Sequence, residues 1–248
     1  MRFNIFKEAR LSLVILSLVL LVTLLFYFIA TMFTSMGYKG LRAEKVIDNI
    51  AVKMPVVIID AGHGGEDPGA VSNGLVEKEL NLEIAKLLNE ILTSNGYQTY
   101  LTRSDDRLLY ANGEEERKKY YDVRNREKIA NSFGNAIFIS VHMNKFPADY
   151  CKGLQSFFNG SNEEGRRLAE SIQDNIKHLQ KDNKRVVSDS KNTIYLLEKL
   201  KMPATLVECG FISNEYEADL LKNSDYKAVL TMSVYCGIAK YLEKYNEN

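Results

Sequence analysis

Short apolar runs alternate with longer amphipathic stretches along most of this chain. Six apolar runs predict β-strands: VVIIDA at 56–61, QTYLT at 98–102, AIFISVH at 136–142, LQSFF at 154–158, TIYLL at 193–197 and ATLVEC at 204–209. Apolar residues at helical spacing predict helices at 77–94, 120–133, 163–179, 215–221 and 225–245. This alternation indicates an α/β domain, with a mostly parallel twisted sheet of about six strands and helices on both faces.

A different pattern occupies the N-terminus. Residues 11–33 form an uncharged apolar run that follows a short head containing Arg2, Lys7 and Arg10. The run is long enough to cross a bilayer and longer than the apolar part of a usual secretory signal, so we expect an uncleaved transmembrane helix. The basic head then predicts residues 1–10 on the cytoplasmic side and the rest of the chain outside the cell. Cleavage of the segment would instead release a secreted domain.

The remainder of the chain divides simply. Residues 34–54 are polar and mixed, and we interpret them as a linker. Residues 55–248 have the length of one catalytic domain, and no internal repeat interrupts them.

Composition narrows the classes of function. The chain has 32 basic and 32 acidic side chains, so its formal net charge is zero and we expect no nucleic-acid partner. The three cysteines have no C-x-x-C spacing, which argues against a disulfide framework and against a cysteine zinc site.

Two of the three histidines stand where predicted strands end. His63 follows VVIIDAG, and His142 closes AIFISVH. Because the carboxyl ends of parallel strands meet at one edge of a sheet, the two imidazoles can approach one another there. A single histidine at a strand end is more often a hydrogen-bonded rim residue than a ligand. Two histidines at equivalent places favour a metal.

A catalytic zinc takes three nitrogen or oxygen ligands and keeps one position open for water. Glu66, Glu77 and Glu79 are all candidates for the third ligand, and an acidic side chain in a first helical turn also has an ordinary role beside the helix dipole. Glu208 ends an apolar run, where a charged side chain needs either a basic partner or a catalytic purpose. Beside a zinc it would serve as the general base.

Four motifs occur in order along the chain: IIDAGHGGEDPGA, VEKELNL, FISVHMN and PATLVECGFISNEYEADLL. Together they resemble the zinc-dependent N-acetylmuramoyl-L-alanine amidases of the amidase 3 type, and the resemblance covers about residues 55–243. It implies that His63, Glu77 and His142 bind one Zn²⁺ per chain and that Glu208 is catalytic. It also favours Glu77 over Glu79.

The arrangement of an apolar N-terminal segment before a bare catalytic domain is similar to that of the membrane-anchored, germination-specific amidases of spore-forming bacteria. Those enzymes strip peptide from muramic acid so that muramic lactam can form in the spore cortex. The resemblance implies peptidoglycan glycan and stem peptide as substrate, and a membrane anchor at 11–33 or an accessory or activating protein for targeting. The alternatives are a vegetative amidase for daughter-cell separation, another zinc wall hydrolase such as a peptidase or deacetylase, and an inactive wall-binding scaffold.

Three further polar residues are candidates for substrate binding. Arg103, Arg124 and Asn144 follow or lie between the predicted strands, and arginine pairs bidentately with carboxylates. They could bind a carboxylate or a sugar of the substrate, although each also has an ordinary structural or solvated interpretation.

Overall fold

The computed structural model describes residues 18, 20–32, 54–148 and 150–245. The chain divides into two compact units, Met1–Lys53 and Met54–Asn248. The strands and helices from β1 to α7 all fall in the second unit.

A six-stranded sheet forms the centre of the Met54–Asn248 unit, with the strand order β4-β1-β5-β8-β6-β7. The strands are β1 (Val56–Ala61), β4 (Thr99–Leu101), β5 (Ala136–Asn144), β6 (Gln155–Phe158), β7 (Ser188–Asp189) and β8 (Ala204–Phe211). β4, β1, β5 and β8 run parallel to their neighbours, whereas β6 is antiparallel to β8 and parallel to β7. The prediction of a mostly parallel sheet of about six strands is confirmed.

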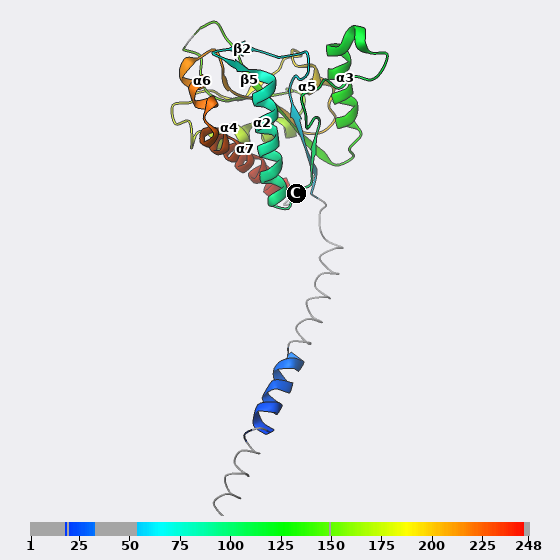
Figure 1. Cartoon of the computed structure of the whole chain (residues 1–248), viewed down its shortest axis with the longest axis vertical. Helices are drawn as coiled ribbons and strands as arrows, with labels where there is room; N and C mark the ends of the chain where they lie inside the picture. The colour runs from blue at the N-terminus through cyan, green and yellow to red at the C-terminus, as the bar shows by residue number, and fades with distance from the viewer. Residues whose placement is uncertain (1–17, 19, 33–53, 149, 246–248) are drawn as a thin grey trace, which may run out of the picture. The chain divides into compact units, whose positions relative to one another are not determined.

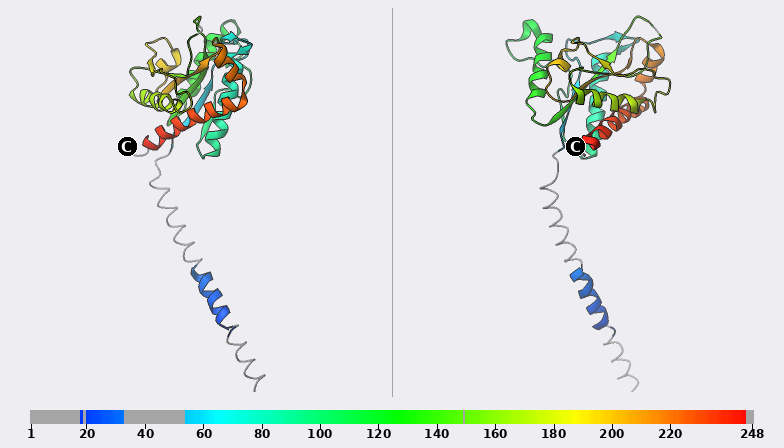
Figure 2. Two further views of the ribbon diagram at one scale, coloured as in Figure 1. Left: turned by 90° about the vertical axis from the view of Figure 1, so that its left-hand side faces the viewer. Right: turned by 180° about the vertical axis from the view of Figure 1, so that it is seen from behind.

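Helices cover both faces of this sheet (Figures 1 and 2). One face packs against four helices: α2 (Glu77–Ser94), α4 (Glu163–Ile176), α6 (Glu215–Lys222) and α7 (Ser224–Tyr245). The other face packs against α3 (Lys118–Asn131), which follows the short 3₁₀ helix η1 (Glu115–Arg117), and against α5 (Tyr195–Lys199). Each face of the sheet has its own hydrophobic core: the first core lies under α2, α4, α6 and α7, and the second lies under α3 and α5. Successive strand residues alternate between the faces, so Val57 and Ile59 pack in the first core and Ile58 packs in the second.

One predicted strand is wrong. Residues 193–197 do not extend the sheet, because Tyr195–Lys199 forms α5 and buries Leu196 and Leu197 against the face that also packs on α3. A short apolar run has no period long enough to separate a strand from a buried helical turn. The sixth strand is instead β7, which has only two residues and carries no apolar run.

A small hairpin was not predicted. β2 (Val71–Ser72) pairs antiparallel with β3 (Leu75–Val76) through Asn73 and Gly74, which both have positive φ. The Asn-Gly pair is the sequence signal for this turn, since a two-residue hairpin loop favours left-handed conformations at both positions.

The predicted transmembrane helix at 11–33 is also wrong. In the described part of the chain, no helix is long and apolar enough to cross a membrane. The helical residues described in that region are 18 and 20–32. The predicted head at 1–10 and nearly all of the predicted linker at 34–54 lie outside the described residues.

Candidate metal centre

Three side chains meet at the carboxyl edge of the sheet. His63 follows β1, His142 lies in β5, and Glu77 is the first residue of α2. One ligand atom of each lies within 4.8 Å of the others, and the two imidazole centroids are 5.0 Å apart. Two imidazoles and a carboxylate are a donor set that suits zinc. Glu79 and Glu66 do not belong to the cluster.

The Glu77 carboxylate connects the three. Its Oε1 lies 2.9 Å from His142 Nδ1 and 3.3 Å from His63 Nε2. The backbone N–H of Ala70 donates to Oε2 at 2.7 Å, which fixes the carboxylate plane. Although burial opposes its charge, the hydrogen bonds with His142 and His63 hold the pKa of Glu77 well below its usual range. The carboxylate is therefore charged and ready to bind a cation.

Asp67 orients the His63 imidazole. Its Oδ2 lies 2.7 Å from His63 Nδ1, and its Oδ1 accepts from Lys119 Nζ at 2.6 Å. A carboxylate on one ring nitrogen fixes the tautomer and leaves the other nitrogen, here Nε2, for a metal. Burial works against a charged imidazole, but the Glu77 and Asp67 carboxylates raise the pKa of His63 to about 9. The site thus favours positive charge at the place where the ligands converge.

Two glycines allow this close approach. A Cβ on Gly62 would lie 2.2 Å from His142 Nε2. A Cβ on Gly69 would lie 2.5 Å from Glu77 Oε2 and 2.7 Å from His63 Cδ2, and Gly69 also has φ +65°. No real Cβ approaches so closely, so any side chain at these positions would displace a ligand. This explains why a glycine-rich segment follows β1.

Two buried arginines hold the backbone that carries His63. Arg103 donates to the carbonyls of Ala61 at 2.9 Å and Gly62 at 3.0 Å, and Arg126 donates to those of Ala61 and His63 at 2.8 Å each. Only 1% of Arg103 is exposed, and its other donors bind the carbonyls of residues 78 and 105. These contacts support the structural role for Arg103, which is to position the loop, and its role toward a substrate stays a prediction.

Glu208 lies beside the cluster. It occupies β8 directly opposite His142 in β5. In the part of the chain that is described, its Oε2 atom is buried without a hydrogen-bond partner. Burial, helped by the charge of Glu77, raises the pKa of Glu208 to about 7, against the opposite influence of His142 and His63. Such a carboxyl group can take up and release a proton near neutral pH.

The other two predicted substrate-binding residues lie outside the cluster. Asn144 is half-buried at the end of β5, and its carbonyl accepts from Ile212 N at 2.9 Å. Arg124 lies on α3 and stacks on the rings of Tyr120 and Tyr195. Their roles toward a substrate stay predictions.

Sequence reasoning missed Asp67, Lys119 and Arg126. Asp67 follows His63 by four residues within the glycine-rich segment, and this proximity was the available signal. The partners on α3 are more than fifty residues away in sequence, so only the fold reveals them.

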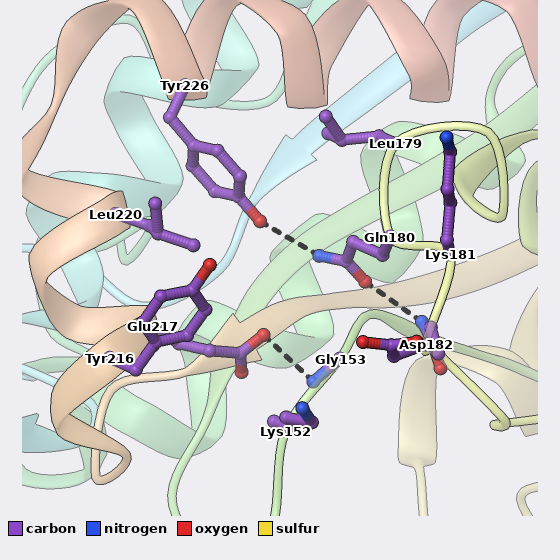
Figure 3. Close-up of a pocket in the computed structure, with 11 residues that line it drawn as sticks. Lys152, Gly153, Leu179, Gln180, Lys181, Asp182, Tyr216, Glu217, Leu220 and Tyr226 are labelled. Atoms are coloured by element: carbon purple, nitrogen blue, oxygen red, sulfur yellow. Dashed lines mark hydrogen bonds between the residues drawn. The ribbon is translucent and has the colours of Figure 1, made fainter.

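A separate cavity of about 400 Å³ opens beside α6 and the start of α7 (Figure 3). In its wall, the Glu217 carboxylate accepts from Gly153 N at 2.9 Å and Phe211 N at 2.8 Å, and Gln180 donates to the Tyr226 hydroxyl at 2.9 Å. The residues predicted to bind metal or substrate do not line it. The cavity is therefore distinct from the metal centre.

The sequence of the chain is similar to those of known proteins of one family. Residues 57–240 match the family model described as N-acetylmuramoyl-L-alanine amidase. The chain is 35% identical over 192 residues to the germination-specific N-acetylmuramoyl-L-alanine amidase of Bacillus subtilis, covering 75% of this chain and 79% of that relative. It is also 33% identical to the B. subtilis amidase LytC, over 77% of this chain but only 37% of LytC.

A solved structure agrees with this placement. The structure of the CwlD amidase from Clostridioides difficile in complex with the GerS lipoprotein is similar to this chain, with 36% identity and a TM-score of 0.73. The similarity covers 77% of this chain and 99% of that one.

Proposed function

The chain belongs to the N-acetylmuramoyl-L-alanine amidase family and is a peptidoglycan hydrolase of that type, and from this premise we propose that it works with Zn²⁺ held by His63, Glu77 and His142. The observation that carries the proposal is the convergence of these three side chains within 4.8 Å. The buried Oε2 of Glu208 has no hydrogen-bond partner among the described residues, which also fits a site that receives a cation and a water.

When bound, zinc supplies a Lewis acid that polarises a carbonyl and makes water acidic near neutral pH. Glu208 takes the proton of the attacking water and passes it to the departing nitrogen of L-alanine. Its pKa of about 7 suits both halves of this transfer. Asp67 keeps the His63 ring in one orientation throughout.

Replacing the Glu208 carboxylate by an amide tests whether Glu208 is the base. Glu208→Gln keeps the shape of the side chain but removes the base, so turnover should fall at least about a hundredfold. Zinc content, measured by atomic absorption, should stay near one per chain. Unchanged turnover would exclude Glu208 as the proton carrier.

The ligands should behave differently from Glu208. His63→Ala and His142→Ala should lose zinc and activity together, since each change removes a metal ligand. Full zinc occupancy in either variant would contradict the ligand assignment.

We also propose that the substrate is the spore cortex, where removal of the peptide precedes formation of muramic lactam. The names of the germination-specific amidase and of the CwlD–GerS complex support this, and the latter suggests an accessory protein for this chain as well. Action on peptidoglycan requires a location outside the cytoplasmic membrane.

Product analysis tests this choice. Mass spectrometry of spore and vegetative peptidoglycan after incubation, with and without chelator, should show zinc-dependent release of peptides with a free L-alanine amino group, and more from cortex. Cuts within the peptide would indicate a peptidase, and released acetate a deacetylase. Preference for vegetative wall would favour a role in cell separation.

A further inference from the structure

Two guanidinium groups share one aromatic ring at the start of α3. The Cζ atom of Arg117 lies 4.2 Å from the centroid of the Tyr120 ring, and that of Arg124 lies 5.1 Å from it. Arg124 also lies 4.4 Å from the centroid of Tyr195 on α5, the helix beside α3 in Figure 1. We call Arg117, Tyr120, Arg124 and Tyr195 the arginine–tyrosine cluster.

The positive charge of this cluster is poorly compensated. Within the described residues, Arg117 has no ion pair, and Arg124 meets only Glu127, at 3.9 Å. That Glu127 oxygen already accepts the hydroxyl hydrogen of Tyr195. The neighbouring lysines are different, because Lys118 pairs with Glu66 at 2.7 Å and Lys119 with Asp67 at 2.6 Å. Two like charges around one ring repel each other unless an anion joins them.

The cluster is exposed, and Tyr120 is the sequence neighbour of a residue that binds next to the metal centre. Arg117 and Tyr120 are exposed, and about 40% of the Arg124 side chain is exposed. Tyr120 directly follows Lys119, whose ammonium binds the carboxylate that orients His63. The start of α3, which carries Tyr120, is therefore linked to the metal centre through Lys119 and Asp67.

We propose that the arginine–tyrosine cluster binds a carboxylate of the peptide that is being removed. This rests on the proposed function, which supplies an acidic stem peptide as substrate. Guanidinium groups that stack on rings keep their N–H edges free and can bind carboxylates bidentately. The rings hold the guanidinium groups in place. The cluster would then select peptides with free carboxylates over amidated ones.

The experiment compares two soluble muropeptides that differ only in whether the peptide carboxylates are free or amidated. In the full chain, the Arg117→Gln/Arg124→Gln double variant should raise KM for the free acid about tenfold, with kcat unchanged. KM for the amidated substrate should stay the same. Arg124→Lys in place of Arg124→Gln should recover part of the loss, since charge returns without the bidentate edge.

Arg166→Gln/Arg167→Gln is the matched control, because both arginines are exposed on α4, a helix that packs on the opposite face of the sheet. Arg166 pairs with Glu163 at 2.6 Å, and Arg167 pairs with Glu164 at 2.9 Å. This control changes the net charge equally and should leave both KM values unchanged. Equal KM increases for the acid and amidated substrates in the double variant, or no increase, would overturn the inference.

Binding of the released peptide separates this inference from the proposed function. Calorimetry on the full chain should show the free-acid peptide binding about tenfold more tightly than its amidated form, and the double variant should lose the difference. Equal affinities would refute the carboxylate site. Selective binding of the free acid without any turnover would contradict the proposed amidase reaction. It would still support the carboxylate site.

Discussion

Gly62 is the residue on which the position of His142 depends most directly. A Cβ there would lie 2.2 Å from Nε2 and 2.3 Å from Cε1 of that imidazole. Gly62→Ala must therefore displace the ring from its position beside Glu77. We expect zinc affinity to fall at least about tenfold and activity to fall with it, as when a residue that orients a metal ligand is lost. Zinc titration with a competing chelator measures the change.

Gly134→Ala is the control for this change. Gly134 is exposed, and a Cβ at that position would meet no described atom within 4 Å. The substitution should leave zinc affinity unaltered. Wild-type affinity in Gly62→Ala would show that the imidazole can move without loss, and that the close packing is incidental.

Single functional residues could be predicted where a metal-binding side chain stands at the end of a predicted strand. His63 and His142 were found because parallel strands end at one edge, and the structure does bring them together. Spacing alone could not separate Glu77 from Glu79. The carbonyl contacts of Arg103 could not be predicted, because the sequence of a loop does not show which arginine turns inward.

A buried ionic network joins three elements beneath the metal centre. Asp60 of β1 accepts from Arg126 of α3 at 2.6 Å and from Ser140 of β5 at 2.7 Å. Burial opposes the charge of Asp60, but Arg126 and the hydroxyls of Ser140 and Thr102 hold its pKa below the ordinary 3.8. Since the folded state binds this proton less readily, the network stabilises the protein above about pH 4. The contribution is lost as pH falls below that value.

Asp60→Asn tests the network through the pH dependence of stability. In the wild type, the free energy of unfolding should fall as pH drops below about 4, and the variant should show a shallower slope, by up to about 1.4 kcal/mol per pH unit. Urea denaturation at several pH values measures both slopes. Asp174→Asn, which removes an exposed surface carboxylate paired with Lys177, should keep the wild-type slope. Identical slopes in all three proteins would show that Asp60 does not control acid stability.

Long elements, in which the hydrophobic pattern repeats several times, were predictable from the sequence, and short elements were not. The helix predicted at 77–94 matches α2 at both ends, because its buried positions recur at helical spacing over eighteen residues. The run at 193–197 has too few residues to show a period, and α5 became helical because its leucines pack against the second core. The two-residue strand β7 is defined only by its pairing with β6.

The buried core of the molecule lies within the Met54–Asn248 unit, whose two hydrophobic clusters flank one sheet. A protein consisting of residues 54–248 should therefore fold alone, with a thermal midpoint within about 3 °C of that of the full chain. Differential scanning fluorimetry measures both. A much lower midpoint would show that the preceding residues contribute to the stability of the catalytic unit.

Zinc should stabilise this unit as a whole, because its three proposed ligands come from β5, the start of α2 and the segment after β1 and converge only in the folded chain. At a free zinc concentration one hundred times the dissociation constant, binding adds about 2.7 kcal/mol. For a domain of this size the midpoint should rise by roughly 5–10 °C. Chelator should reverse the shift, and His142→Ala should abolish it. An equal shift in that variant would mean that zinc binds elsewhere on the protein.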